Sequence, residues 1–240
     1  MTDLTPFDRE LVVRPLRLED YERVAALQLR CFPHMKPWTR EQFASHLGHF
    51  PEGQLGLEYG GVLVGSSSSL RLDFGMYDGL HTWAEITDNG MIRNHDPKGA
   101  TLYGMEVMVD PDYRGMKLAR RLYEARKELA RDLNLMNIVI GGRIPGYAEH
   151  ADTMSARAYV DRVLSKSLVD PVLTTQVANG FVLKRLLQNY LPSDEESRGW
   201  ATFLEWSNLD YQPDPNRRLV AARRVRICVV QYQMRRVADF

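Results

Sequence analysis

A short apolar segment that leads through a tight turn into a long amphipathic helix constrains this chain more than any other feature. The segment ends at Asp110-Pro111, and a helical period of apolar residues follows over residues 115–133. The leucines of this period fall on one face, and its basic residues, Arg126 among them, fall mostly on the other, which we expect to be solvated. The first N–H groups of a helix lack partners and lie at the positive end of its dipole. The junction therefore predicts a binding place for a phosphate or pyrophosphate.

The rest of the chain alternates strand and helix patterns. Apolar segments bounded by turn residues predict strands over residues 11–17, 54–59, 62–72, 102–109, 136–140 and 201–206, with a further strand beginning near residue 180. Helical periods predict helices over residues 18–31, 39–47, 154–164 and 171–178. Thr39 and Gln42 have the spacing of a capping box. Residues 73–99 fit neither pattern and are interpreted as a long insertion. The pattern predicts an α/β fold.

Composition and spacing exclude several classes of protein. The 31 basic and 31 acidic residues balance, so we expect no broad surface for nucleic acid. No apolar run approaches the ~20 residues of a membrane-spanning helix, and the first residues do not resemble a signal peptide. Cys31 and Cys228 are far apart, and His46 and His49 lack a third ligand at a telling spacing, so the two histidines are interpreted as a polar helix face. We expect a cytoplasmic protein without a metal site or a membrane partner.

Residues 107–122 resemble the acyl-coenzyme A signature of the GNAT N-acetyltransferases, in which a strand and a turn lead through an Arg/Gln-x-x-Gly-x-Gly/Ala loop into a long helix. Arg114 and Ala119 match the first and last positions of this loop, and Lys117 stands where glycine is usual. Further likeness lies in Val13-Arg14-Pro15, Ala158-Tyr159 and Gly180-Phe181. The resemblance implies a GNAT domain over residues 1–211, with a mixed, twisted sheet flanked by helices.

The resemblance also implies an acyl-CoA-dependent N-acyltransferase that passes an acetyl group from acetyl-CoA directly to an amine, without a metal. The residues that would bind the cofactor are Met108, Val109, Arg114, Gly115, Met116, Lys117, Leu118 and Ala119. The pantetheine arm would lie between the strands over residues 102–109 and 136–141. The acceptor is expected to be a small-molecule or peptide amine, in a pocket shaped by residues 73–99 and 161–192.

Two residues are candidates for proton transfer. Glu106, on the strand over residues 102–109, is the candidate base that removes the proton of the acceptor amine. Tyr159 is the candidate acid for the leaving thiolate, from its place in the family-like pattern, and Tyr147 is a rival. The structural alternatives are a solvated carboxylate for Glu106 and an aromatic ring that packs a helix onto the sheet for Tyr159.

The last 29 residues, 212–240, differ from the rest. Two prolines within residues 212–216 indicate a boundary, and a basic segment follows. Residues 225–232 resemble the opening strand of carbon–nitrogen hydrolases of the nitrilase superfamily, and fusions of a GNAT domain with such a hydrolase form a family. Cys228 in this strand is interpreted as a packed small residue. Alternatively, the strand pairs with the edge of the first domain's sheet. A second functional hypothesis is a catalytically silent acyl-CoA-binding module that regulates a fused or partner hydrolase.

Overall fold

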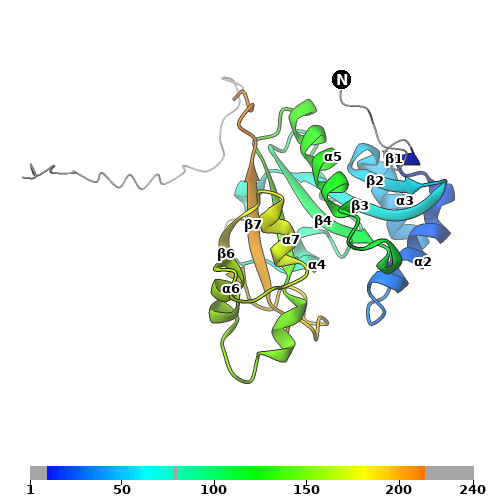
Figure 1. Cartoon of the computed structure of the whole chain (residues 1–240). Coiled ribbons are helices and arrows are strands. Elements are labelled where there is room, and N and C mark those ends of the chain that lie inside the picture. The colour runs from blue at the N-terminus through cyan, green and yellow to red at the C-terminus, as the bar shows by residue number, and fades with distance from the viewer. Residues whose placement is uncertain (1–9, 78–79, 214–240) are drawn as a thin grey trace, which may run out of the picture.

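A seven-stranded sheet forms the centre of the molecule in the computed structural model, which describes residues 10–77 and 80–213 (Figure 1). In sequence the strands are β1 (Leu11–Pro15), β2 (Gln54–Tyr59), β3 (Val62–Leu72), β4 (Thr101–Val109), β5 (Asn137–Arg143), β6 (Val182–Leu187) and β7 (Ala201–Ser207). They are ordered β1-β2-β3-β4-β5-β7-β6 across the sheet. The predicted α/β fold is confirmed. The strand expected within residues 225–232, with Cys228, lies outside the described residues.

The parallel pair at the centre of the sheet opens along its length. β4 and β5 run parallel, whereas the other neighbouring strands are antiparallel. Their ladder ends where Gly104 lies opposite Ile140. Beyond that point β4 continues to Val109 and β5 to Arg143 without pairing to each other. The two strands therefore diverge, and the backbone groups that face the gap have no partner strand.

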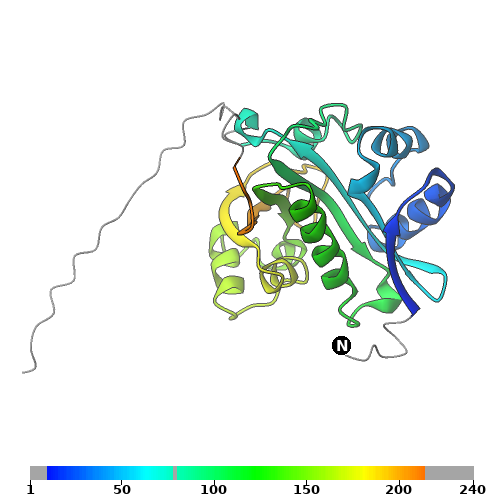
Figure 2. The same ribbon diagram turned by 90° about the horizontal axis from the view of Figure 1, so that it is seen from above.

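Helices cover both faces of this sheet. They are α2 (Tyr21–Cys31), α3 (Arg40–His49), α4 (Trp83–Ile86), α5 (Leu118–Asp132), α6 (Ala156–Leu164) and α7 (Leu173–Ala178). On one face, Leu118 and Leu122 of α5 pack on Leu57 of β2 and Val64 of β3. The helices α2 and α3 lie across the sheet from α5 (Figures 1 and 2). The capping box predicted for α3 is present. The Thr39 side chain accepts a hydrogen bond from the Gln42 backbone N–H, and the Gln42 side chain accepts one from the Thr39 backbone N–H.

Several boundaries differ from the sequence predictions by a few residues, and two of them lie beside the point where β4 and β5 diverge. β5 extends through residues 141–143, because these residues pair with β7 rather than closing the strand. The helix α5 begins at Leu118 and not at residue 115. Gly115 has φ 85° and Lys117 has φ 60°, so the backbone before Leu118 is left-handed at two positions and cannot belong to an α-helix.

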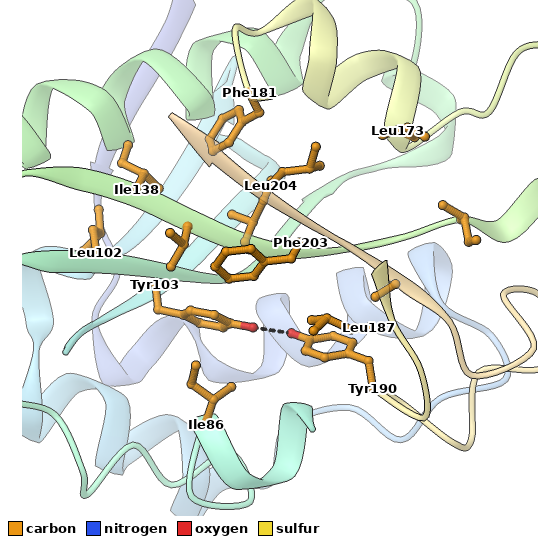
Figure 3. Packing of buried hydrophobic residues seen from close by; sticks show 14 of the residues in the cluster. Ile86, Leu102, Tyr103, Ile138, Leu173, Phe181, Leu187, Tyr190, Phe203 and Leu204 are labelled. Atoms are coloured by element: carbon orange, nitrogen blue, oxygen red, sulfur yellow. Dashed lines mark hydrogen bonds between the residues drawn. The ribbon is translucent and has the colours of Figure 1, made fainter. Parts of the chain in front are cut away.

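The largest buried cluster surrounds β5 and β7. Figure 3 shows Phe181 and Leu173 on the α7 side of these strands and Ile86 of α4 on the other side. Tyr103 of β4 and Tyr190, which follows β6, meet on the α4 side with their hydroxyl oxygens 2.6 Å apart. This contact ties the loop after β6 to the sheet next to the point where β4 and β5 diverge.

Candidate active site

Two cavities lie at the divergence of β4 and β5. We call the first, of about 780 Å³, the helix-start cavity; it is lined by the end of β4, the start of α5 and part of α7. We call the second, of about 490 Å³, the tryptophan cavity; Trp38 and Trp83 are among its walls. The residues that line both are Phe32, Val107, Tyr123, Arg143 and Val172. The two cavities therefore meet between the diverging strands.

The helix-start cavity contains the residues predicted to bind the cofactor, except one. Those that line it are Met108, Val109, Arg114, Gly115, Lys117, Leu118 and Ala119. Met116 does not line it, and 39% of that residue is exposed. The left-handed backbone at Gly115 and Lys117 turns the side chain between them outward.

The start of α5 leaves hydrogen-bond donors available to this cavity. Lys117 is the N-cap residue, and its side chain makes no capping bond. In the described part of the chain, the backbone N–H groups of Leu118 and Ala119 have no backbone partner, and that of Arg120 donates to the Lys117 carbonyl at 3.1 Å. Together with the helix dipole, these groups form a site for an anion such as a pyrophosphate. The glycine-like conformation of Lys117 also explains why a glycine fits the family pattern there.

Arg114 is placed to contribute to that anion site. A competing interpretation pairs it with Asp110 or Asp112, but Arg30 of α2 takes both carboxylates, at 2.9 Å and 2.7 Å. Arg114 is exposed on the wall of the helix-start cavity. A guanidinium in this position supplies bidentate, charge-assisted bonds to a phosphate.

Glu106 faces the tryptophan cavity because β4 contains a bulge. Ser68 of β3 lies opposite Glu106, and the next residue, Ser69, lies opposite Gly104, so Met105 is an extra residue. Strict alternation along β4 would place residue 106 on the same face as Gly104, the face that α5 covers. The bulge reverses the alternation and directs Glu106 toward α2 instead.

The environment of Glu106 raises the affinity of its carboxyl group for a proton. Its Oε2 accepts a hydrogen bond of 2.7 Å from Nε2 of Gln28, whose Oε1 in turn accepts from the backbone N–H of Trp38 at 2.8 Å. Its Oε1 is buried and has no partner within hydrogen-bonding distance, although the indole of Trp38, whose Nε1 is likewise buried and unpaired, lies near enough to lower the pKa of the carboxyl group. Burial raises the pKa of Glu106 to about 7, against the opposing effects of the Gln28 amide, the Trp38 indole and the positive charge of Arg126. A carboxyl group with such a pKa can accept a proton near neutral pH.

Arg126 supports the bulge from the α5 side. Its Nη2 donates to the carbonyls of Ser68 (3.0 Å) and Glu106 (2.7 Å) and to Oγ of Ser67 (2.6 Å). The guanidinium lies over Gly104, where a Cβ would come within 2.3 Å of Nη1. Arg126 is 1% exposed, so the expectation that it lies on a solvated helix face was wrong. Burial lowers its pKa to about 10, and it remains a cation at neutral pH.

The structure does not bring Tyr159 to either cavity. It is buried in α6, and its hydroxyl donates to Oδ2 of Asp170 at 2.9 Å. Its rival Tyr147 is also buried and donates to the Met154 carbonyl at 3.2 Å. Glu106 is therefore the one member of the predicted catalytic pair that reaches the tryptophan cavity.

Two other tyrosines reach the tryptophan cavity, and the sequence reasoning missed both. Tyr123, three residues before Arg126 on α5, lines both cavities. Tyr190 lines the tryptophan cavity, and its phenol end lies against Gly141, where a Cβ would come within 2.4 Å of the hydroxyl. The apolar spacing of α5 placed Tyr123 on its inner face, which was the available signal. Residues 161–192 were expected to shape the acceptor pocket, but nothing in the sequence singled out Tyr190 among them.

Both regions expected to shape the acceptor pocket line the tryptophan cavity. Trp83 comes from the insertion, and Val172, Gln176, Tyr190 and Leu191 come from residues 161–192. Among residues 10–77 and 80–213, no group of three or more potential metal ligands is found. Within the same ranges, no helix is long and apolar enough to cross a membrane.

Comparison with known proteins agrees with this geometry. The model of the acetyltransferase (GNAT) family matches residues 21–145. The chain is 38% identical over 206 residues to the Bacillus subtilis protein named Uncharacterized N-acetyltransferase YkwB, covering 84% of this chain and 91% of that protein. It is also 51% identical over 239 residues to Probable hydrolase YhcX of the same organism, covering 99% of this chain and 47% of YhcX. The chain thus spans about half the length of YhcX.

A solved structure shares the fold. The GphF GNAT-like decarboxylase in complex with isobutyryl-CoA superposes with a TM-score of 0.69 at 22% identity, covering 82% of this chain and 98% of that one. At this identity the likeness supports the fold alone. The match of the family model over more than half of the chain and the similarity to YkwB decide the assignment: the chain belongs to the GNAT acetyltransferase family.

Proposed function

We propose that the chain is an acyl-CoA-dependent N-acyltransferase that transfers an acetyl group from acetyl-CoA to an amine. The observation that carries the proposal is the meeting of the two cavities where β4 and β5 diverge, with an anion site at one end and Glu106 at the other. The cofactor's pyrophosphate binds Arg114 and the N–H groups at the start of α5. Its pantetheine arm lies in the gap beside Met108 and Val109.

The reaction then proceeds by direct attack. The acceptor amine binds in the tryptophan cavity next to Oε1 of Glu106, which removes its proton. The amine nitrogen bonds to the thioester carbon, and the carbon–sulfur bond breaks with its electron pair on sulfur. Unpaired backbone N–H groups of β4 beyond Gly104 are available to the developing oxyanion. The products are the amide and coenzyme A.

We infer that Tyr123, rather than Tyr159, donates the proton to the leaving thiolate. Tyr123 lines both cavities and so lies beside the proposed position of the thioester sulfur. The hydroxyl of Tyr159, by contrast, donates its hydrogen bond to Asp170. Burial raises the pKa of Tyr123, which keeps its hydroxyl protonated. Replacement by Phe should lower the rate of coenzyme A release, and Tyr159→Phe, which removes a hydroxyl of similar burial, is the matched control.

The first experiment is calorimetric titration with acetyl-CoA of the chain and of its Arg114→Ala variant. We expect micromolar binding that weakens by about tenfold or more in the variant, since a charge-assisted pair is lost. Release of free thiol in the presence of amines then measures turnover, and Glu106→Gln should abolish most of it while acetyl-CoA still binds. Unchanged turnover in Glu106→Gln would remove Glu106 from the mechanism.

A silent, cofactor-sensing module is the alternative hypothesis, and the buried, unpartnered oxygen of Glu106 favours catalysis over it. A sensor would bind acetyl-CoA without releasing thiol with any amine. The proposal that residues 212–240 lead into a carbon–nitrogen hydrolase rests on the likeness of residues 225–232. It is supported by the name of Probable hydrolase YhcX, of which this chain spans 47%.

A further inference from the structure

The walls and charges of the tryptophan cavity limit the acceptor that it accommodates. This step rests on the proposed function and deepens it. We propose that the acceptor is a small monoamine with an apolar, preferably aromatic, body and no second positive charge. Polyamines, aminoglycoside-like polycations and lysine-rich peptides are thereby excluded as preferred substrates.

The walls of the cavity are largely aromatic and aliphatic. Trp38 and Trp83 stack with ring centroids 5.5 Å apart and an interplanar angle of 25°. The backbone N–H of Trp83 donates to the carbonyl of Tyr190 at 2.8 Å, which joins two segments of the wall that are far apart in sequence. The further aliphatic and aromatic residues of the wall include Phe32, Met35, Met105, Val107, Ile140, Val172 and Leu191. A flat apolar group that enters such a space is desolvated and gains stacking contacts.

The charges of the cavity fit one ammonium group and no more. Among its lining residues in the described part of the chain, Glu106 is the only carboxylate. The other charged groups are cations: Arg126 is buried beside Glu106, and Lys36 is exposed at the rim. Arg143 is also present, but Asp194 and Glu196 pair with it at 2.6 Å each.

A second ammonium that stays inside the tryptophan cavity would therefore meet no further carboxylate among its lining residues in the described part of the chain. It would lose hydration in an apolar space, and Arg126 or Lys36 would repel it. Both effects disfavour binding. Sites that select polycations need several carboxylates, and this cavity provides one. The same reasoning favours a primary amine attached directly to a short apolar arm, because the unpartnered Oε1 of Glu106 is the position at which the amine must bind.

A matched pair of amines tests the proposal. The full chain, saturated with coenzyme A, is titrated with hexylamine and with 1,6-diaminohexane, which share a carbon chain and differ by one ammonium group. We expect hexylamine to bind about tenfold more tightly than the diamine, and 2-phenylethylamine to bind more tightly than hexylamine. Preference for the diamine, or binding of none of the three amines, overturns the proposal.

Two variants sharpen the result. Lys36→Glu places a second carboxylate at the rim and should strengthen binding of the diamine by roughly threefold or more, with hexylamine little changed. Trp83→Ala should weaken 2-phenylethylamine more than hexylamine while leaving coenzyme A affinity unchanged, because Trp83 lines only the tryptophan cavity. If neither variant changes the relative affinities of the amines, the acceptor does not occupy this cavity.

The titration with coenzyme A separates this proposal from the function on which it rests. A chain that binds coenzyme A but prefers the diamine keeps the proposed function and loses the acceptor class. A chain that does not bind coenzyme A loses the proposed function, and the relative affinities of the amines are then measured on the chain alone.

Discussion

At the scale of single residues, the site depends on where one carboxyl group points and how readily it takes a proton. The pKa of Glu106 is about 7 because burial opposes its charge. A base must be deprotonated, so kcat/KM for the acceptor should rise with pH and level off above 7, falling about tenfold per pH unit below that value. A pH–rate profile measures this. We call the fall in rate at low pH the acidic limb of the profile. An acidic limb whose apparent pKa lies near the ordinary value for a glutamic acid would contradict the assignment.

Arg126 should influence that profile although it touches no substrate in our mechanism. Its charge lowers the pKa of Glu106, and its hydrogen bonds hold the bulge. Arg126→Met should therefore move the limb above pH 7 and lower kcat by about tenfold or more, since bulge and charge are lost together. Arg126→Lys keeps the charge and should leave the limb closer to 7. Identical limbs in all three proteins would mean that Arg126 acts on stability alone.

At the scale of secondary-structure elements, α3 carries a histidine whose environment the sequence did not reveal. His46, expected on a polar face, is fully buried, and its Nε2–H donates to the Gly90 carbonyl at 2.6 Å. Its Nδ1 is buried without a partner, so a proton added there has no acceptor. Burial lowers the pKa of His46 to about 4. α3 therefore holds the insertion in place with a neutral imidazole.

This histidine makes stability depend on pH. Because the pKa is lower in the folded than in the unfolded chain, the unfolded chain takes up the proton first as the pH falls below 6.5, and stability decreases down to about pH 4. Between pH 7 and pH 5 the loss should be ~2 kcal/mol in the free energy of unfolding. Urea denaturation of the chain and of His46→Gln at both pH values measures it. An equal loss in both proteins would contradict the assignment.

At the start of α5, Lys117 stands where the family pattern usually has a glycine. Lys117 adopts φ 60°, a conformation that costs a lysine ~1 kcal/mol relative to glycine. Lys117→Gly should keep the turn and remove one positive charge from the helix-start cavity. We expect acetyl-CoA to bind about threefold more weakly. This loss of affinity should be smaller than the loss in Arg114→Ala. Tighter binding in Lys117→Gly would show that the side chain obstructs the cofactor.

At the scale of the whole molecule, the order of strands and helices was predictable, because alternating and helical periods survive in each segment. The family signature also located the helix-start cavity through Arg114 and its neighbours. The direction of Glu106 was not predictable, since a bulge is a relation between two strands and leaves no trace in one of them. The burial of Arg126 was missed for a similar reason. A helical period shows which face of a helix is mostly apolar, but not which single basic residue lies buried against the sheet.

The short ladder between β4 and β5 has a consequence for the behaviour of the molecule. Only four residue pairs join β1–β4 to the strands β5, β7 and β6, so the sheet consists of two halves with a narrow seam between them. A pantetheine arm in the gap would hydrogen-bond to both edges and act as an added rung of the ladder. The bound cofactor would then stabilise the contact between the two halves of the sheet as well as take part in the reaction. Each release of coenzyme A would make this contact more mobile beside the cavity that the next acceptor enters.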